Sequence, residues 1–349
     1  MTSATAYAYL GPEGTFTEAA LRRLPAYAAH GEEPPRRPYP SVPAALDAVR
    51  DGDCATAVVP LENSVKGVVP ATMDQLAGAG LSGLHITGEV ELPVTFALMA
   101  PDGTDLADVR EVFSHPHALA QCAGWLAEHL PGARAVPADS TAAAAHGVAG
   151  RPGGGAAAVA APPAAERYGL RVLATGLGRP GGAVTRFVAV SQAWFPPART
   201  ARDRTSLVVT TDDGGPARLA AILALFTTRD IEVSRIHAWP TGDRLGSYHY
   251  FVDVDGHVEN PAVRGALSTL PTAGASARFL GSYPRWTGPR RPVVGDRHAA
   301  PPPAVGHRAA TPPPPVVGNR SAGAERVGTT ERRPRGRLRS DHPATSTRT

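Results

Sequence analysis

The sequence is poor in cysteine and in long apolar runs, and each shortage excludes a class of protein. Its two cysteines, Cys54 and Cys122, have no metal-type spacing and cannot form a disulfide framework, so we expect two free thiols in a reducing cytoplasm. No stretch approaches the roughly 18 consecutive apolar residues that a membrane-spanning helix needs. The first residues lack a basic segment followed by an apolar core, so we expect no signal peptide and no membrane partner.

Basic residues are concentrated at the end of the chain. The 349 residues carry a net charge of +4, but residues 287–349 contain 12 Arg and 4 acidic residues, a net of +8. Residues 1–286 therefore carry a net charge of −4, which argues against a nucleic-acid partner. The terminal segment also has 11 prolines and no Phe, Trp or Tyr. Such a segment cannot bury enough apolar surface to fold, so we predict that residues 287–349 are disordered.

Residues 1–192 alternate short apolar runs with alanine-rich stretches, a pattern typical of an α/β fold. The long apolar run around residues 86–99 can carry the chain from one subdomain to another. We therefore expect two α/β lobes with a cleft between them. The predicted strands are 6–10, 56–59, 88–99, 111–114, 156–160 and 187–190, and the predicted helices are 17–24, 42–50, 118–130 and 141–148.

Residues 204–286 change to the order strand, helix, strand, strand, helix, strand. This order fits a ferredoxin-like βαββαβ module. The predicted elements are the strands 205–211, 231–237, 247–254 and 277–281 and the helices 216–228 and 261–270. Residues 193–203, with two adjacent prolines, are the expected linker.

A short apolar strand at residues 57–59 leads to a carboxylate, an amide and a hydroxyl, those of Glu62, Asn63 and Ser64. In an open α/β sheet, ligands bind in the crevice at the carboxyl ends of the strands. We therefore expect these three side chains to face a small molecule. The alternative is a polar loop that only caps a buried strand.

Three further segments place hydroxyl groups at predicted helix starts. They hold Thr15, then Ser114 with His115, and then Ser140 with Thr141. The free backbone amides of a helix start can bind an anion, although capping of the helix would explain the same residues. The histidines at 115 and 117 have no further ligand cluster near them in the sequence, so we expect no metal.

A fourth segment, Thr185, Arg186 and Phe187, puts a hydroxyl and a guanidinium at the mouth of an apolar strand. Arginine suits bidentate binding of a carboxylate, and the alternative is pairing with a structural acid. The four segments together predict a pocket for a small polyanion. The sequence has no nucleophile elbow, Walker loop or nicotinamide fingerprint, so we expect no cofactor.

The order of these motifs resembles the prephenate dehydratase family. The segments GPEGTFTEAA, PLENSVKGVVPATMDQL, SHPHALAQC, DSTAAAA and VTRF follow the family's order, and residues 204–286 resemble its ACT regulatory domain. The resemblance, over residues 5–284, implies a two-lobed, periplasmic-binding-protein-like α/β catalytic domain over residues 1–192. It also implies dehydration and decarboxylation of prephenate to phenylpyruvate in L-phenylalanine biosynthesis, without a cofactor, by a homodimer or homotetramer.

The resemblance also implies roles for individual residues. Thr185 provides the hydroxyl associated with activity, as a hydrogen-bond donor or proton relay, and Arg186 clamps a substrate carboxylate. His115 is a second candidate for the proton donor. The residues implied to bind or orient prephenate are Arg186, Phe187, Asn63, Ser64, Thr15, Ser114, His115, Ser140 and Thr141.

The chain departs from the family at the two segments that carry phenylalanine feedback there. The expected Pro-Gly-Ala-Leu reads Gly215-Pro216-Ala217-Arg218-Leu219, and the expected Glu-Ser-Arg-Pro reads His237-Ala238-Trp239-Pro240. L-Phenylalanine remains a candidate effector, alongside other amino acids. We expect catalysis to persist while inhibition by phenylalanine is weakened or lost.

Three other functions stay open. A solute-binding or sensor protein without turnover can use the same two-lobed fold. A related enzyme would act on arogenate, and another would decarboxylate prephenate without forming the aromatic ring. The pair Thr185-Arg186 favours dehydration over the last of these.

Overall fold

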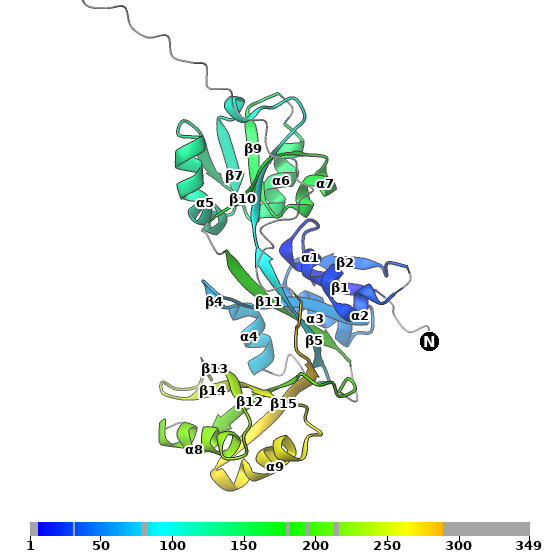
Figure 1. The fold of residues 1–349 in the computed structure, drawn as a ribbon, viewed down its shortest axis with the longest axis vertical. Coiled ribbons are helices and arrows are strands. Elements are labelled where there is room, and N and C mark those ends of the chain that lie inside the picture. The colour runs from blue at the N-terminus through cyan, green and yellow to red at the C-terminus, as the bar shows by residue number, and fades with distance from the viewer. Residues whose placement is uncertain are drawn as a thin grey trace, which may run out of the picture. The chain divides into compact units, whose positions relative to one another are not determined.

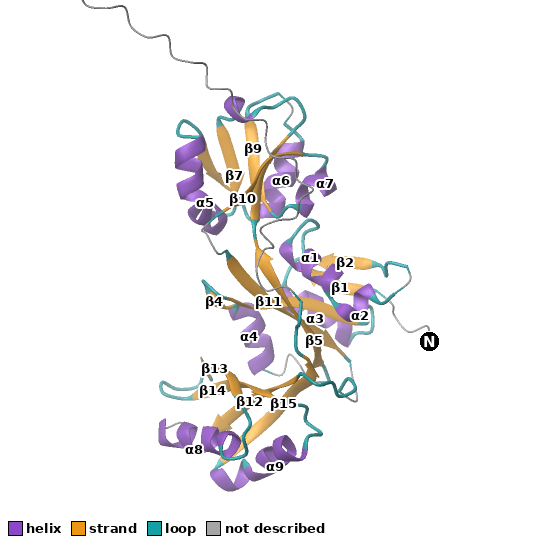
Figure 2. Cartoon of the chain, in the orientation of Figure 1, coloured by secondary structure: helices purple, strands orange, loops and turns teal. Residues whose placement is uncertain are grey.

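The computed structural model describes residues 6–30, 32–78, 83–151, 153–178, 182–192, 196–211 and 216–288. All of them lie within one compact unit, residues 1–300. The segment predicted to be disordered lies, from residue 289 on, outside the described residues, and so does Gly215. Three β-sheets with flanking helices make up the described chain (Figures 1 and 2). None of the helices described is long and apolar enough to cross a membrane.

The first lobe is built on a sheet of strand order β2-β1-β3-β11-β5, with the short strand β4 beside β3. Strand β1 is parallel to β2 and β3, whereas β11 lies antiparallel between β3 and β5. The elements are β1 (Tyr7–Leu10), α1 (Phe16–Arg23), α2 (Pro25–Ala28), β2 (Arg36–Tyr39), α3 (Val42–Arg50), β3 (Thr56–Asn63), β4 (Gly67–Val68), α4 (Pro70–Ala77), β5 (His85–Val94) and β11 (Ala183–Ser191).

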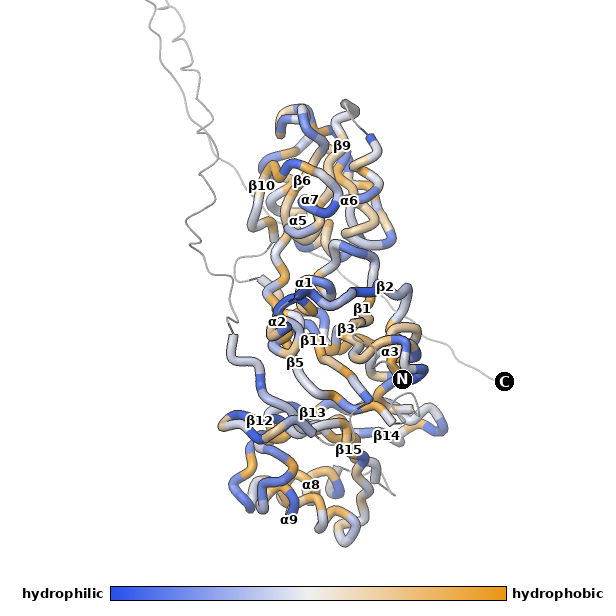
Figure 3. The backbone as a smooth tube through the Cα atoms, turned by 90° about the vertical axis from the view of Figure 1, so that its right-hand side faces the viewer, coloured by the Kyte–Doolittle hydropathy of each residue, from blue (hydrophilic) through white to orange (hydrophobic). Residues whose placement is uncertain are grey.

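Side chains alternate between the two faces of this sheet, as the pleat of a β-strand requires. Val58 and Phe187 pack with residues of α1 and α2 in one core cluster. Val59 and Val188 pack with residues of α3 and α4 in another. Hydrophobic residues along α3 and β3 are visible as orange segments in Figure 3. The two faces of the sheet therefore have different neighbours, which decides where each side chain of β3 and β11 points.

The second lobe holds a sheet of strand order β10-β6-β9-β7-β8. Strand β5 runs almost directly into β6, and the chain returns to the first lobe through β11, so the chain crosses between the lobes twice. The two-lobed α/β architecture is confirmed. The elements are β6 (Phe96–Ala100), η2 (Leu106–Asp108), β7 (Glu111–Ser114), α5 (Pro116–His129), β8 (Arg134–Pro137), α6 (Thr141–Ala149), β9 (Ala156–Ala160), α7 (Pro163–Tyr168) and β10 (Arg171–Leu177).

The third part is the βαββαβ module. Its antiparallel sheet has the order β13-β14-β12-β15, and α8 and α9 share a core with one face of it. Residues of the other face, Phe251 and Leu280 among them, belong to the same cluster as Ile86 and Val188 of the first lobe. The elements are β12 (Asp203–Thr211), α8 (Pro216–Thr227), β13 (Val233–Pro240), β14 (Tyr248–Asp255), α9 (Pro261–Thr269), η3 (Pro271–Ala273) and β15 (Ala275–Pro284).

Close packing of β15 on β5 depends on Gly281. A Cβ atom on Gly281 would collide with the carbonyl oxygen of Ile86. We expect Gly281→Ala to lower Tm by about 5 °C, because overpacking of this kind costs about 1–3 kcal/mol. The matched control is Gly132→Ala, since no heavy atom lies within 4 Å of its added Cβ. Equal Tm values for Gly281→Ala and the unchanged protein, measured by calorimetry, would contradict this.

Candidate active site

Asn63 and Thr185 form a hydrogen-bonded pair at the end of β3. They are register partners across β3 and β11, and Asn63 Nδ2 donates to Thr185 Oγ1 at 2.8 Å. The Asn63 carboxamide oxygen accepts from the backbone amides of Val65 and Lys66 at 3.0 Å each, which fixes the orientation of the amide. Because the Thr185 oxygen accepts from Asn63, its own proton is available to a ligand oxygen. Thr185 is 8% exposed, so water competes little for that proton.

Ser64 orders the backbone beside this pair. Its hydroxyl oxygen accepts from the Val184 amide at 2.9 Å, and its own amide donates to the Val184 carbonyl at 2.8 Å. These two hydrogen bonds join the turn after β3 to the start of β11. The Ser64 hydroxyl, predicted to contact the substrate, thus forms a hydrogen bond with the backbone of Val184.

The structure corrects the expectation that Arg186 clamps a substrate carboxylate. Its guanidinium lies on the opposite face of β11 and donates to Glu89, Asp253 and the Tyr283 hydroxyl. Glu62, expected to face a ligand, accepts from Arg235 Nε at 2.5 Å. Because neighbouring residues on a strand point to opposite faces, one row of the β3–β11 ladder sends Asn63 and Thr185 one way, and the next row sends Glu62 and Arg186 the other. The alternative interpretation of Arg186, pairing with structural acids, describes this arrangement.

Phe187 also differs from its expected role. It is 2% exposed and belongs to the core cluster with Tyr9, Leu21 and Val58. Its ring packs in this core on the same face of β11 as Thr185.

A second group of predicted residues lies at the carboxyl ends of β7 and β8 in the second lobe. These strands are parallel, and the Ala138 amide donates to the Ser114 carbonyl at 2.9 Å, so α5 and α6 begin at the same edge of the sheet. Ser140 caps α6, accepting from the Ala143 amide at 2.9 Å, and Thr141 is the first residue of that helix. Ser114 is fully buried and donates to the Val159 carbonyl at 2.5 Å. Ser140 thus caps one of two helix starts at this edge, whose positive ends suit an anion, whereas the Ser114 hydroxyl ties β7 to β9.

His115 caps α5 with its ring. Its Nδ1 accepts from the His117 amide at 3.2 Å, which puts the proton of a neutral imidazole on Nε2. Burial, with a smaller contribution from His117, lowers the pKa of His115. A neutral Nε2–H is a hydrogen-bond donor for an anion, without the charge of an imidazolium.

Thr15 lies in the turn between β1 and α1 of the first lobe. Its hydroxyl caps α1, accepting from the Glu18 amide at 3.4 Å and donating to the Leu10 carbonyl at 3.3 Å. One residue on, the Phe16 ring meets Phe96 of the second lobe edge-on, with ring centres 5.5 Å apart. Thr15 therefore stands where the lobes touch.

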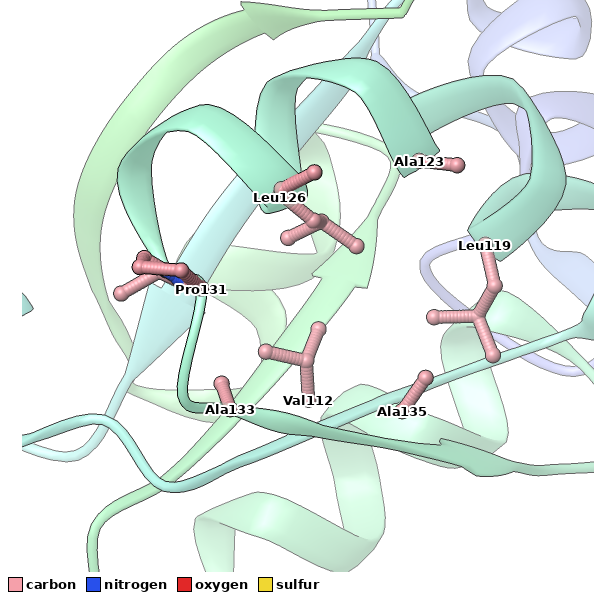
Figure 4. Close-up of a pocket in the computed structure, with 9 residues that line it drawn as sticks. Val112, Leu119, Ala123, Leu126, Pro131, Ala133 and Ala135 are labelled. Carbon is pink, nitrogen blue, oxygen red and sulfur yellow. The ribbon is translucent and has the colours of Figure 1, made fainter.

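A pocket of about 220 Å³ lies elsewhere, beneath α5. Figure 4 shows its lining of apolar side chains from α5, β7, β8 and the segment between α5 and β8, among them Val112, Leu126 and Pro131. A pocket without polar side chains does not suit a polyanion, so it is separate from the site defined above. In the described part of the chain, no group of three or more His, Cys, Asp or Glu residues could hold a metal ion.

The fold and these groups define a class: a two-lobed α/β protein with polar strand ends and helix starts beside the lobe junction, followed by a βαββαβ module. The family model for prephenate dehydratase matches residues 7–193. The prephenate dehydratase of Mycobacterium tuberculosis (strain H37Rv) is 46% identical over 286 residues, which are 81% of this chain and 87% of that one. The chain belongs to the prephenate dehydratase family, whose activity is that of a hydro-lyase.

Two solved structures share the fold over most of the chain. The prephenate dehydratase from Arthrobacter aurescens in complex with L-Phe has a TM-score of 0.72 and 43% identity, covering 80% of this chain and 90% of that one. GqqA, described as a novel type of quorum quenching acylase, has a TM-score of 0.71 and 29% identity, covering 81% and 98%. Since one scaffold serves both, the reaction has to be argued from the site.

The protonation state of His115 can be tested by pH dependence. Its pKa lies below the usual value of about 6.5, so the ring is neutral at pH 7 and above. We therefore expect that deprotonation of His115 causes no fall in kcat for prephenate between pH 6.5 and 8. His115→Gln, which keeps a donor, should retain kcat within about threefold, because a positioned neutral hydrogen bond contributes modestly. A fall in kcat with a midpoint near pH 7 that is absent in His115→Gln would show that a charged His115 is the acid.

Proposed function

We propose that this protein converts prephenate to phenylpyruvate by dehydration and decarboxylation. The observation that carries the proposal is the Asn63–Thr185 pair, which leaves one poorly hydrated hydroxyl proton at a strand end of a prephenate dehydratase chain. Prephenate is a dianion whose ring bears a hydroxyl across from a carboxylate. Loss of CO2 and of the hydroxyl makes the ring aromatic, and aromatisation supplies the driving force.

In the proposed reaction, the bond from the ring to its carboxylate breaks and its electron pair enters the ring. The C–O bond on the far side of the ring breaks, and the oxygen takes up one proton and leaves as water. Thr185 donates its hydrogen bond to that leaving oxygen and relays the proton, since a threonine hydroxyl is too weak an acid to give up its own proton outright. Asn63 orients the Thr185 hydroxyl by donating to its oxygen.

The second lobe binds the pyruvyl carboxylate of prephenate in this proposal. The starts of α5 and α6 present backbone amides at one edge of the sheet, and the neutral His115 ring adds a donor there. Fixed dipoles of this kind stabilise an anion without a metal ion. The departing carboxylate needs poor solvation, and the contact between Phe16 and Phe96 where the lobes meet limits the water that can enter.

The decisive test is turnover of prephenate by the full chain and by variants of Thr185. We expect Thr185→Val to lower kcat by roughly 10²- to 10⁴-fold with KM changed only a few-fold, because the hydroxyl acts in the transition state. Thr185→Ser, which keeps the hydroxyl, is the matched control and should stay within about tenfold of the unchanged protein. Phenylpyruvate formation is the measurement.

Other outcomes of the same assay would replace the proposal. Tight prephenate binding by the unchanged protein without turnover would make it a sensor. Faster turnover of arogenate than of prephenate would make it an arogenate dehydratase. A larger loss of kcat in Asn63→Ala than in Thr185→Val would reverse the roles of the two residues.

We further propose that feedback by L-phenylalanine is weak in this enzyme. Where the family has Glu and Arg, His237 and Trp239 lie on the face of β13 that also holds Arg235. Trp239 packs against the core of the first lobe, and its Nε1 donates to Asp74 Oδ1 at 3.1 Å. Burial, followed by the charge of Arg235, lowers the pKa of His237, so a neutral ring replaces the carboxylate that would pair with an amino-acid ammonium.

Arg218, in the other altered segment, is turned toward η3. Its Nη1 donates to the Ala273 carbonyl at 2.8 Å. The side chains of Pro216 and Ala217 lie outside the described part of the structure. We also propose that the enzyme is a homodimer or homotetramer, because β13 forms an outer edge of its sheet and ACT domains commonly pair.

A titration with L-phenylalanine tests the weakened feedback. We expect concentrations up to about 100 μM to lower the rate by less than half, since one lost charge-assisted pair of about 1.5–3 kcal/mol weakens binding at least about tenfold. The double variant His237→Glu with Trp239→Arg restores the family's residues and should increase the sensitivity. Strong inhibition of the unchanged protein at micromolar phenylalanine would refute the idea.

A further inference from the structure

Arg186 is the centre of a buried charge network between the first lobe and the βαββαβ module. Its Nε donates to Glu89 at 2.7 Å, one terminal nitrogen donates to Asp253 at 2.6 Å, and the other donates to the Tyr283 hydroxyl at 2.8 Å. Glu89 belongs to β5 of the lobe, whereas Asp253 and Tyr283 belong to β14 and β15 of the module. Every nitrogen of the guanidinium is therefore paired, and two of the three pairs cross to the module.

Asp253 is held in its ionised form within this network. Burial would raise the pKa of Asp253, but the nearby arginines, Arg186 above all, lower it to about 2. The network also includes Arg204, whose terminal nitrogen donates to Glu89 at 2.5 Å, and Ser206, which donates to Asp253 at 2.6 Å. The two arginines thus pair with two carboxylates, Glu89 and Asp253. Separating the module from the lobe would leave these buried charges without their partners, which costs free energy.

A second link to the module starts from the same row of the β3–β11 ladder. Glu62 is the register partner of Arg186, and it accepts from Arg235 Nε of β13 at 2.5 Å. Both links therefore start on one row of the β3–β11 ladder, and the neighbouring row is the Asn63–Thr185 pair. The module therefore binds Glu62 and Arg186 of one row from one face of the ladder, while Asn63 and Thr185 of the next row point to the other face.

We propose that Arg186 and Glu62 are positioning residues, through which seating of the module on β3 and β11 sets the hydrogen bond from Asn63 to Thr185. Adjacent residues on a strand share a peptide unit, so a side chain pulled toward one face fixes the backbone from which its neighbour projects. Small misplacements of a catalytic group are costly, of order 10²-fold for about 1 Å. This inference rests on the proposed function for its kinetic test and names no effector.

Another contact between the lobe and the module does not involve the Glu62–Arg186 row of the ladder. Arg278 of β15 donates to the carbonyls of Leu76 and Ala77 at the end of α4, the second at 2.7 Å. Those carbonyls belong to the end of α4, which packs on β3 but contributes no residue to the Glu62–Arg186 row of the ladder. Arg278→Met therefore removes hydrogen bonds across the same interface without touching the row beside Thr185, which makes it the matched control.

The kinetic test uses Asp253→Asn and Arg235→Gln in the full chain. Each should lower kcat for prephenate about tenfold with KM within about twofold, because alignment and not binding is lost. In an Asn63→Ala background the same substitutions should lower kcat less than about twofold further, since the hydrogen bond through which they act is already gone. Their effects on Tm should be equal in both backgrounds, and Arg278→Met should lower Tm but leave kcat unchanged.

Three results would overturn the proposal. The first is an unchanged kcat in both module variants, the second is an undiminished loss in the Asn63→Ala background, and the third is an equal loss of kcat in Arg278→Met. Arg235→Gln keeps the test decisive if Asp253→Asn does not fold, because Arg235 lies outside the fully buried network. An unchanged protein that makes no phenylpyruvate would refute the proposed function instead.

An NMR measurement that needs no turnover tests the coupling between the module and Asn63 independently of the proposed function. In protein labelled with ¹⁵N-asparagine, the side-chain amide of Asn63 is identified by its loss in Asn63→Ala. We expect this signal to shift in Asp253→Asn and Arg235→Gln and to stay in place in Arg278→Met. A signal that is unmoved in all three variants would refute the coupling whatever the reaction is.

Discussion

The pairing of β3 with β11 is the constraint on which both the site and the interface depend. One row of this ladder carries Asn63 and Thr185, and the next carries Glu62 and Arg186. The pleat sends the two rows to opposite faces, so a step of one residue, from Thr185 to Arg186, separates the hydroxyl proposed to face the substrate from a buried guanidinium. The βαββαβ module covers the end of the face beneath α3 and α4, whereas α1 and α2 pack on the other face.

Most of the fold could be predicted from the sequence because its buried strands and capped helices carry strong local signals. The α3 helix has its predicted bounds, since Ser41 caps it and a proline follows in its first turn. Four of the described strands escaped prediction, namely β2, β4, β8 and β10, and each pairs with a single neighbouring strand at the outside of its sheet. Outer strands tolerate charge and proline, as the sequence RRPY of β2 shows, so they lack the apolar pattern on which a prediction relies.

The sequence predicted which residue types form the site, but not the directions in which their side chains point. Asn63 and Thr185 lie together, as the motifs implied, although they are 122 residues apart. Arg186 could not be placed from the sequence, because a β-strand presents either face to a ligand and only the position of the third sheet decides which. The two acids that hold it come from β5 and β14, and no local spacing connects them to residue 186. Serine residues at helix starts were ambiguous for a different reason, since capping and anion binding use the same amides.

The buried guanidinium of Arg186 also limits how this enzyme can be divided. A chain cut after β11 would keep Arg186 and Glu89 but lose Asp253, Tyr283 and Arg204, and the apolar face that they close would be open to water. Catalytic and regulatory regions are often exchanged between proteins as independent pieces, but here the boundary passes through a shared core. Any transplant of these lobes onto another partner would have to bring a complementary acid and hydroxyl to the same place, or replace the arginine.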